Sequence, residues 1–474
     1  MRRTKIVCTL GPATKTKEQI SDLADAGMDI ARLNMAHGTL EEHRATIRIL
    51  NELNVERAKS KTYKHCIGIL VDIRGAEVRT EDVKQPLVIH RGEEVVFSFL
   101  PRPEEKRQVI QVNHKGFVND VKGVERILLD NGELTFDLLS IEANGTVIAR
   151  AREDGKIGSR RHVNLPGADL DLPSITEQDW EDIAFAAQER VDFLGLSFIR
   201  KASEVEEARA FLKSKKSAVH LIAKIETRQG VDNIEEIIAA SDGIMVARGD
   251  LGAEVPFESV PVIQDDIVMH CRAAGKPVIV ATQMLESMIQ LPMPTRAEVT
   301  DMAHAVMTGT DSTMLSGETA NGRHPLAAVD AMDRVLSSTE SHLAESKRME
   351  NQSLTTERDA RAEAAVSLAV STSAKAILVI TRTGKTALDV ARFRPSLPVI
   401  ACTDTTGVQR FLQLSYGLIP LQLPLDDDPE QTVDASMTKA KSLGLLSSGD
   451  GIILVSDARV RSRTVNTIQV RMID

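Results

Sequence analysis

Short apolar runs alternate with amphipathic stretches along most of this chain, and this alternation constrains its fold more than any other feature. Such alternation is typical of parallel βα units. The runs that we expect to be strands are residues 6–9, 29–34, 66–72, 191–197, 219–225, 243–247, 277–282 and 312–315. Eight such units predict an α/β fold built on a (β/α)8 barrel, whose functional side chains gather at the carboxyl ends of the strands.

The alternation stops between Asp72 and Val191 for roughly 120 residues, which is far longer than an ordinary βα loop. Short runs rich in Val, Ile and Phe, separated by Asn-Gly turns, predict an all-β insertion here. After a polar stretch at residues 345–361, new strands and helices predict a separate small domain. We therefore expect a barrel formed by residues 1–76 and 165–345, an inserted β-barrel-like lid at 77–164 and a C-terminal α/β domain at 346–474.

The composition argues against several classes of partner. The net charge is -10 and only 3% of the residues are aromatic, so we expect no nucleic-acid or anionic-membrane partner. No apolar run approaches the roughly 20 residues of a transmembrane helix, and no targeting segment is recognisable, although one could have been removed. The four cysteines are scattered and form no Cys-x-x-Cys pair, which is typical of a reduced, cytoplasmic protein.

Polar side chains follow the apolar runs at their predicted carboxyl ends. Residues 219–250 form one βαβ unit that ends its strands in Lys224, Glu226 and Asp250. Carboxylates suit a hard cation such as Mg2+, and a neighbouring lysine suits a phosphate. The other strand ends carry Arg32, Asn34, Asp72, Ser197, Thr282, Ser316 and Glu318. Strand ends are also polar simply because they reach water, but agreement across most of the ends favours a site for a phosphorylated substrate.

Several segments closely resemble the motifs of the pyruvate kinase family. They are KIVCTLGPAT at 5–14, ARLNMAHG at 31–38, NLPG at 164–167, AKIET at 223–227, VARGDLG at 246–252, ATQMLESM at 281–288, PTRAE at 294–298 and MLSGETA at 314–320. The resemblance covers nearly the whole chain in order, and weakens in the lid and in the last hundred residues. It implies transfer of a phosphoryl group from phosphoenolpyruvate to ADP, giving pyruvate and ATP in the last step of glycolysis. It also implies Mg2+ dependence, K+ activation, allosteric control and a homotetramer.

The resemblance also implies roles for individual residues. Glu226 and Asp250 would hold the Mg2+, while Lys224 and Arg32 would bind the phosphoryl group that moves. The remaining implied roles are substrate binding by Ser197, Thr282 and the backbone of Gly249 and Asp250, a proton relay through Ser316 and Glu318, and nucleotide binding by His37, Arg79 and Arg161.

The family's monovalent-cation site shows one departure. Its ligands would be Asn34, Asp72 and the carbonyl of Ile73, but Ala36 stands where the family has a serine. Glu77, which resembles the residue of K+-dependent members, is retained. We therefore expect weakened K+ activation, with water in place of the missing hydroxyl. At the lid hinges three further replacements occur: Ala76 for a usual proline, Arg161 for a usual lysine and His162 for a usual glycine.

A loop in the C-terminal domain resembles the family's effector phosphate cradle. Its residues are Thr381, Arg382, Thr383, Gly384 and Thr386, and an ordinary capped helix start remains an alternative interpretation. Arg459, Arg461 and Arg463 are candidates for a second phosphate contact. The tryptophan of bisphosphate-sensitive members is absent, since Trp180 is the only tryptophan, so we expect a sugar monophosphate or a nucleotide as effector.

Two rival functions remain open at this stage. A Mg2+-dependent lyase on the same barrel would use the carboxylate pair but would not need Lys224 together with a lid, and formation of ATP separates the two. A catalytically silent regulatory subunit is supported only by the altered cation site. Four histidines, His65, His90, His114 and His220, have no acidic partner nearby in the sequence, and we interpret them as surface or core residues.

Overall fold

The structure is a computed structural model that describes residues 1–168, 172–346, 354, 356–460 and 463–474. Within these residues, eight parallel strands close into a barrel in the order β1-β16-β15-β14-β13-β12-β3-β2. They are β1 (Lys5–Thr9), β2 (Ile30–Asn34), β3 (Gly68–Asp72), β12 (Phe193–Leu196), β13 (His220–Ile225), β14 (Gly243–Ala247), β15 (Val278–Ala281) and β16 (Ser312–Leu315). The fold class expected from the sequence is therefore confirmed, and each strand overlaps an apolar run named above.

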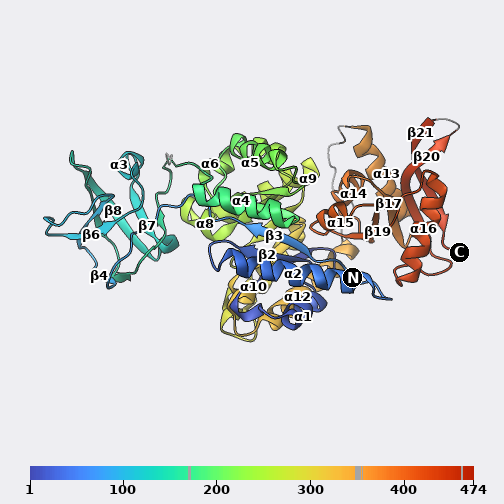
Figure 1. The fold of residues 1–474 in the computed structure, drawn as a ribbon, viewed down its shortest axis with the longest axis horizontal. Coiled ribbons are helices and arrows are strands. Elements are labelled where there is room, and N and C mark those ends of the chain that lie inside the picture. The colour runs from blue at the N-terminus through green and yellow to red at the C-terminus, as the bar shows by residue number, and fades with distance from the viewer. Residues whose placement is uncertain (169–171, 347–353, 355, 461–462) are drawn as a thin grey trace.

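Helices surround the barrel (Figure 1). They are α1 (Lys17–Ala26), α2 (Leu40–Ala58), α4 (Glu177–Glu189), α5 (Ala202–Ser214), α6 (Arg228–Asp232), α7 (Ile234–Ala240), α8 (Arg248–Glu254), α9 (Val260–Ala274), α10 (Arg296–Thr308), α11 (Gly317–Ala320) and α12 (Pro325–Ser346). Several begin with a capping box, in which a threonine side chain accepts a hydrogen bond from the backbone of the acidic residue or amide three positions later. Thr39 with Glu42 and Thr295 with Glu298 are examples. In the described part of the chain, no helix has the length and apolarity needed to span a membrane.

The insertion after β3 is all-β apart from short helical turns. Its described strands are β4 (Leu87–Ile89), β5 (Glu94–Ser98), β6 (Gln108–Gln111), β7 (Arg126–Leu129), β8 (Leu134–Ile141), β9 (Val147–Ala151), β10 (Gly155–Ile157) and β11 (Val163–Asn164), with the turns α3 (Phe117–Asp120) and η2 (Asp130–Gly132). They form a sheet in the order β11-β7-β8-β9-β5-β6 and a small β10-β4 sheet around a core of their own. Figure 1 shows this lid at one end of the molecule, with the barrel in the middle.

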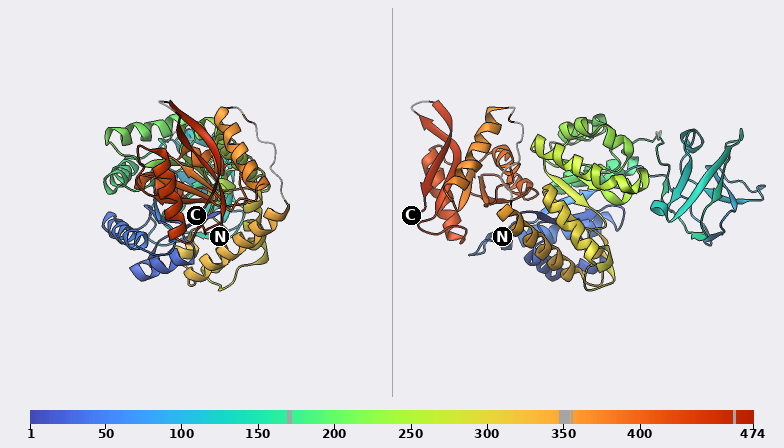
Figure 2. Two further views of the ribbon diagram at one scale, coloured as in Figure 1. Left: turned by 90° about the vertical axis from the view of Figure 1, so that its right-hand side faces the viewer. Right: turned by 180° about the vertical axis from the view of Figure 1, so that it is seen from behind.

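The C-terminal region lies at the opposite end and has its own sheet, in the order β19-β18-β17-β20-β21. Its elements are α13 (Glu357–Ser371), β17 (Ala376–Ile380), α14 (Lys385–Ala391), β18 (Val399–Thr403), α15 (Thr406–Leu412), β19 (Leu418–Gln422), α16 (Pro429–Ser442), β20 (Gly451–Val460) and β21 (Arg463–Met472). Seen along the long axis from this side, the region lies over one end of the barrel (Figure 2). The residue limits of the three domains given above stay a prediction.

The interior of the barrel is continuous with the core of the C-terminal region. Every barrel strand contributes a buried side chain to one shared apolar cluster, which includes Val7, Ile30, Leu70, Phe193, Ile222, Met245, Ile279 and Met314 from the barrel and Val379, Val390 and Leu412 from the C-terminal region. Because close-packed interiors transmit small displacements, this continuity fixes the two regions against each other at the amino ends of the strands.

His114 is a core residue as interpreted, but it has an acidic partner, as do His90 beside Asp154 at 3.7 Å and His220 beside Asp242 at 4.0 Å. His114 and Asp120 are both buried, and the His114 Nε2 and Asp120 Oδ2 atoms lie 2.5 Å apart in the lid. A short helical turn, α3, brings the two side chains together although six residues separate them.

A buried carboxylate joins the barrel to the C-terminal region. Asp311, directly before β16, accepts hydrogen bonds from the backbone N–H groups of Val278 at 3.1 Å and Tyr416 at 2.9 Å. Its Oδ2 also lies 2.7 Å from Arg394 Nη2, and both side chains are almost fully buried. Asp311 thus supplies the anion for Arg394, whose other described hydrogen bonds go to carbonyl oxygens, and it accepts from two buried N–H groups.

We predict that Asp311→Ala destabilises the protein strongly, by about 3–5 kcal/mol, because it leaves the Arg394 guanidinium buried without its anion. Urea unfolding followed by circular dichroism measures the effect. Asp330→Ala is the matched control, since Asp330 is exposed and, among the described contacts, pairs with its helix neighbour Arg334 alone. Equal unfolding midpoints for the two variants would contradict the prediction.

Candidate active site

The side chains predicted from strands β3 and β13 come together at the carboxyl end of the barrel. Lys224 Nζ lies 3.0 Å from Glu226 Oε1 and 3.2 Å from Asp72 Oδ1, and it donates a hydrogen bond to Ser197 Oγ at 2.7 Å. Asp250, in the first turn of α8, lies close enough to affect the charge of both Lys224 and Glu226. Neighbouring parallel strands therefore deliver one ammonium group and three carboxylates to a single place.

The charges of this cluster depend on one another. Burial alone would lower the pKa of Lys224, but the carboxylates of Asp72 and Glu226 outweigh it and raise that pKa above its usual value. Burial, opposed by Lys224 and reinforced by Asp250, raises the pKa of Glu226 to about 7. Burial also opposes ionisation of Asp72, but Lys224 and Arg32 lower its pKa below the usual value. The lysine therefore stays charged at neutral pH. Among the described residues, the cluster holds three carboxyl groups, those of Asp72, Glu226 and Asp250, but only two cations, Lys224 and Arg32.

Arg32 at the end of β2 belongs to the same cluster. Its Nε donates to Asp72 Oδ2 at 2.6 Å and its Nη1 to Thr9 Oγ1 at 3.0 Å. Because these two contacts hold the guanidinium, Arg32 is fixed in orientation near Lys224. A rigid pair of cations at a strand end is suited to a phosphate group.

The residues that follow β14 and β15 are held by each other. The backbone N–H of Gly249 donates to Thr282 Oγ1 at 2.8 Å. Thr282 has a positive φ of 69° and Gln283 one of 54°, which is rare for residues with a side chain. Arg248 stabilises this backbone by donating Nη2 to the carbonyl oxygens of Thr282 at 2.8 Å and Gln283 at 3.2 Å.

The end of β16 presents a buried hydroxyl and a buried carboxyl group. Glu318 accepts hydrogen bonds from the backbone N–H groups of Leu285 at 3.0 Å and Ser316 at 2.7 Å. Burial raises the pKa of Glu318 above its usual value, although these two N–H groups oppose it. The Ser316 hydroxyl is buried and has no hydrogen-bond partner among the described residues, so it is available to a bound molecule.

The predicted metal ligands fit a divalent cation in their chemistry. Glu226 and Asp250 supply carboxylate oxygens, which Mg2+ prefers, in a cluster with an excess of negative charge. Among the described residues, no group of three or more His, Cys, Asp or Glu side chains is arranged to hold a metal. A magnesium ion here would thus take its other ligands from water and from substrate oxygens, as is usual for this ion.

The predicted K+ ligands lie side by side but are already hydrogen-bonded. Asn34 and Asp72 are register partners on β2 and β3, and Asn34 Oδ1 accepts from the backbone N–H of Ala36 at 3.1 Å. The carbonyl of Ile73 accepts from Ser197 Oγ at 2.7 Å. Ala36 adds no side-chain oxygen, so a cation would find one protein ligand fewer than a serine would give.

The three predicted nucleotide-binding residues are not in contact with the cluster. His37 is exposed on the turn after β2, where its carbonyl oxygen contacts His43 Nε2 at 2.9 Å. In the lid, Arg79 pairs with Glu77, and Arg161 pairs with Asp130 at 2.9 Å. Among the described contacts, none joins these arginines to Lys224 or Glu226.

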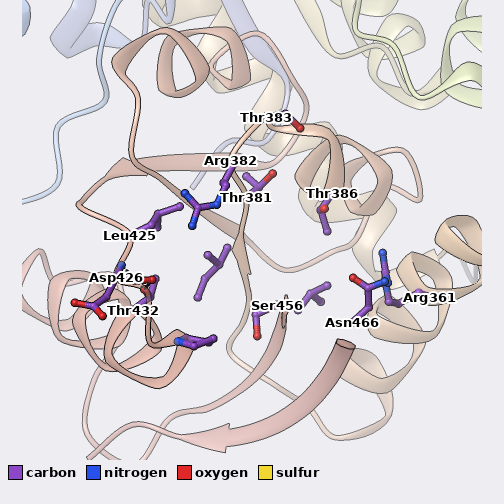
Figure 3. Close-up of a pocket in the computed structure, with 13 residues that line it drawn as sticks. Arg361, Thr381, Arg382, Thr383, Thr386, Leu425, Asp426, Thr432, Ser456 and Asn466 are labelled. Atoms are coloured by element: carbon purple, nitrogen blue, oxygen red, sulfur yellow. Dashed lines mark hydrogen bonds between the residues drawn. The ribbon is translucent and has the colours of Figure 1, made fainter. Parts of the chain in front are cut away.

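The predicted effector loop lines a cavity of about 220 Å3 in the C-terminal region (Figure 3). Thr381, Arg382, Thr383 and Thr386 lie on its wall, and Gly384, with a φ of 84°, closes the turn by donating its N–H to Thr381 Oγ1 at 3.0 Å. Figure 3 shows Arg382 and Arg361 on opposite sides of the cavity. The side chains of Arg459 and Arg463 and all of Arg461 lie outside the described residues.

Several supporting residues were not singled out from the sequence. Thr9 orients Arg32, the backbone N–H of Phe198 donates to Glu226 Oε2 at 2.6 Å, and Arg248 fixes the loop of Thr282. Thr9 and Arg248 directly follow or end apolar runs, so the strand-end rule could have found them. The contact of Phe198 depends on its positive φ of 54°, for which the sequence gives no signal.

Comparison with known protein families gives matches over both large regions of the chain. A family model described as "Pyruvate kinase, barrel domain" matches residues 1–329, and one described as "Pyruvate kinase, alpha/beta domain" matches residues 359–471.

Individual relatives align over the whole chain. Plastidial pyruvate kinase 2 of Arabidopsis thaliana is 39% identical over 477 residues, covering 100% of this chain and 81% of that protein. Pyruvate kinase isozyme G, chloroplastic, of Nicotiana tabacum is 40% identical, with 100% of this chain and 84% of that protein covered. Pyruvate kinase of Geobacillus stearothermophilus is 37% identical, with 100% of this chain and 80% of that protein covered.

Proposed function

The chain belongs to the pyruvate kinase family, and from this premise we propose that it transfers the phosphoryl group of phosphoenolpyruvate to ADP, in a Mg2+-dependent and K+-activated reaction that ends glycolysis. The observation that carries the proposal is the position of Lys224 between Asp72 and Glu226 at the carboxyl ends of the barrel strands. A cation fixed beside two candidate metal ligands is what a phosphoryl transfer site requires.

In the proposed mechanism, Lys224 and Arg32 bind the phosphoryl group on one side. Because Lys224 is held by Asp72, Glu226 and Ser197, its charge is already in place when negative charge spreads over the phosphoryl oxygens. Mg2+, held by Glu226 and Asp250, would supply further positive charge to the substrate oxygens. The N–H groups at Gly249 and Asp250 and the hydroxyl of Thr282 would orient the substrate carboxylate, which would replace Thr282 Oγ1 as the acceptor of the Gly249 N–H.

The product of phosphoryl loss from phosphoenolpyruvate is an enolate, which must gain a proton on carbon. We assign this transfer to the end of β16, where the Ser316 hydroxyl, which has no partner among the described residues, and the buried Glu318 carboxyl lie two residues apart. Because its pKa is raised, Glu318 stays protonated to a higher pH than an ordinary glutamate does. His37, Arg79 and Arg161 are proposed to contact the nucleotide once the lid lies closer to the barrel.

The rival functions are less well supported. A lyase would not need the cation pair of Lys224 and Arg32, and a silent subunit would not need the intact set of Lys224, Glu226, Asp250 and Thr282. ATP formation from phosphoenolpyruvate and ADP distinguishes the kinase from both rivals, because neither a lyase nor a silent subunit produces ATP. Absent turnover under saturating Mg2+, K+ and effector would favour the silent subunit.

We predict that Lys224→Met lowers kcat/KM for ATP formation by about 100- to 1000-fold, because the neutral side chain no longer stabilises the phosphoryl group. Lys224→Arg keeps the charge but changes its position, so we expect a low rate with better retained stability. Lys213→Met on the exposed face of α5 is the control, and thermal unfolding is measured for each variant. A wild-type rate in folded Lys224→Met would refute the proposal.

We also propose that K+ activates this protein only at raised concentration. The reason is that Ala36 contributes no oxygen, while Asn34, Asp72 and Ile73 must share atoms already used in hydrogen bonds. A lost ligand weakens a cation site without abolishing it when water takes its place.

We predict that Ala36→Ser shifts half-maximal activation to a K+ concentration several-fold lower than in the wild type, because the hydroxyl restores a ligand. The rate is measured against K+ at constant ionic strength kept with tetramethylammonium. Ala58→Ser, an exposed position on α2, is the control. Full wild-type activity with K+ rigorously absent would remove the proposal.

We propose further that the cavity lined by Thr381, Arg382, Thr383 and Thr386 binds a phosphorylated effector, a sugar monophosphate or a nucleotide before a bisphosphate. Its support is the combination of hydroxyl groups with Arg382 and Arg361 around one cavity. Asp426 also lines this cavity and disfavours a second phosphate nearby.

We predict that glucose 6-phosphate or AMP raises the melting temperature of the wild type more than fructose 1,6-bisphosphate does. Arg382→Gln should abolish this shift because it removes a cation from the cavity wall, whereas Arg358→Gln, an exposed arginine outside the lining, should retain it. A shift that survives in Arg382→Gln would place the ligand elsewhere.

The proposed assembly is a homotetramer in the cytoplasm. Its support in the described part of the barrel is a set of large apolar side chains that are more than half exposed, which includes Phe257, Val262, Met269 and Met293. Light scattering gives the mass of the assembly directly. The bacterial relatives bear the family name alone, whereas the plant relatives are named plastidial or chloroplastic.

A further inference from the structure

The lid returns to the barrel through a short segment, residues 162–164, that is tied to the rest of the lid. The backbones of His162 and of Arg79 in the outgoing segment form an antiparallel β-bridge. The carbonyl oxygen of His162 also accepts a hydrogen bond from the backbone N–H of Asp130 at 3.0 Å. Val163 and Asn164 form β11, which is antiparallel to β7. The position of this return hinge therefore follows the position of the lid.

One side of the return hinge contacts the element that holds Glu226. The rings of His162 and Phe198 lie edge to face, with centroids 6.0 Å apart. Phe198 donates its backbone N–H to Glu226 Oε2 at 2.6 Å, from a strained conformation with a φ of 54°. A movement of His162 would thus act on a residue that directly orients one of the two candidate metal ligands.

The other side contacts the helix that carries Asp250. Asn164 Nδ2 donates to Glu254 Oε1 at 3.2 Å. Glu254 is the last residue of α8 and Asp250 lies in the first turn of the same helix, so the helix transmits a displacement from one to the other. The lid turn η2 also packs against α8.

This contact is buried and incompletely satisfied. Asn164 is only 2% exposed, and its Oδ1 has no hydrogen-bond partner among the described residues. Burial raises the pKa of Glu254 to about 7, although Asn164 opposes this shift. Groups that orient a metal ligand from behind are known to change metal affinity by about 10- to 100-fold when they are altered.

We propose that Asn164 and Glu254 are positioning residues that couple the lid's return hinge to the metal site, so that the affinity for a divalent cation depends on this contact. The inference rests on the proposed role of Glu226 and Asp250 as metal ligands. Neither Asn164 nor Glu254 needs to touch the metal or the substrate. Asn164 of the hinge contacts Glu254, and Glu254 affects the position of Asp250 through the helix α8 that both belong to.

The test is Mn2+ binding without substrate, measured by the loss of the free-ion electron paramagnetic resonance signal. Asn164→Asp removes the amide group that donates to Glu254 and should weaken Mn2+ binding roughly 10-fold. The sign is informative, because an added negative charge near the site would by itself strengthen the binding of a cation.

The swap Asn164→Asp with Glu254→Gln restores the hydrogen bond with donor and acceptor reversed and keeps the net charge of the wild type. We expect this double variant to recover most of the lost affinity. Asn119→Asp makes the same chemical change on an exposed lid residue of α3 and should bind Mn2+ as the wild type does. Circular dichroism melting confirms that each variant is folded, and recovery in the swap excludes a general loss of structure.

The outcomes separate this inference from the proposed function. If Glu226→Gln abolishes Mn2+ binding while folded Asn164→Asp binds normally, the coupling is wrong and the metal site stands. If Asn164→Asp binds weakly and the swap does not recover, the specific contact is refuted. If Glu226→Gln leaves binding unchanged, the metal assignment fails and this inference fails with it.

Discussion

The burial of Lys224 among carboxylates is the interaction on which the rest of the site depends. A buried ammonium group is tolerated only with anions close by, and here Asp72 and Glu226 lie 3.2 and 3.0 Å from it. The barrel supplies these anions because β3, β12 and β13 are neighbouring parallel strands, whose carboxyl ends lie at the same end of the barrel. Arg32 then pairs with the other oxygen of Asp72. The two cations balance most of the negative charge of the carboxylates, and a divalent cation would balance the rest.

The three regions of the chain are coupled to this cluster in different ways. The C-terminal region shares an apolar core with the barrel and joins it through Asp311 and Arg394, so it is packed against the amino ends of the strands. The lid has a core of its own and meets the barrel near the carboxyl ends through the return hinge. The cavity lined by Thr381 and Arg382 and the lid thus lie on opposite sides of one closely packed barrel.

Much of this architecture could be predicted from the sequence because its physical signals are local. Strands buried on both faces appear as continuous apolar runs, and strand ends reveal Lys224, Glu226 and Asp250 by position alone. What remained hidden depends on contacts between distant segments. Asp72 was assigned as a cation ligand, yet its oxygens also compensate Arg32 and Lys224, and the partner of His114 became visible only in the fold. Such contacts are set by the tertiary structure rather than by spacing.

Thr282 shows that fixing the orientation of a side chain in the site costs backbone strain. A β-branched residue with a φ of 69° is strained, typically by about 1–3 kcal/mol, and is kept only where its surroundings determine it fully. Here Arg248 holds the carbonyl oxygen and Gly249 holds the hydroxyl oxygen, so the side chain keeps one orientation. The backbone conformation that fixes the Thr282 hydroxyl is thus not the conformation of lowest strain. If Thr282 binds the substrate as proposed, selection for a more robust fold and selection for a faster catalyst act in opposite directions at this position.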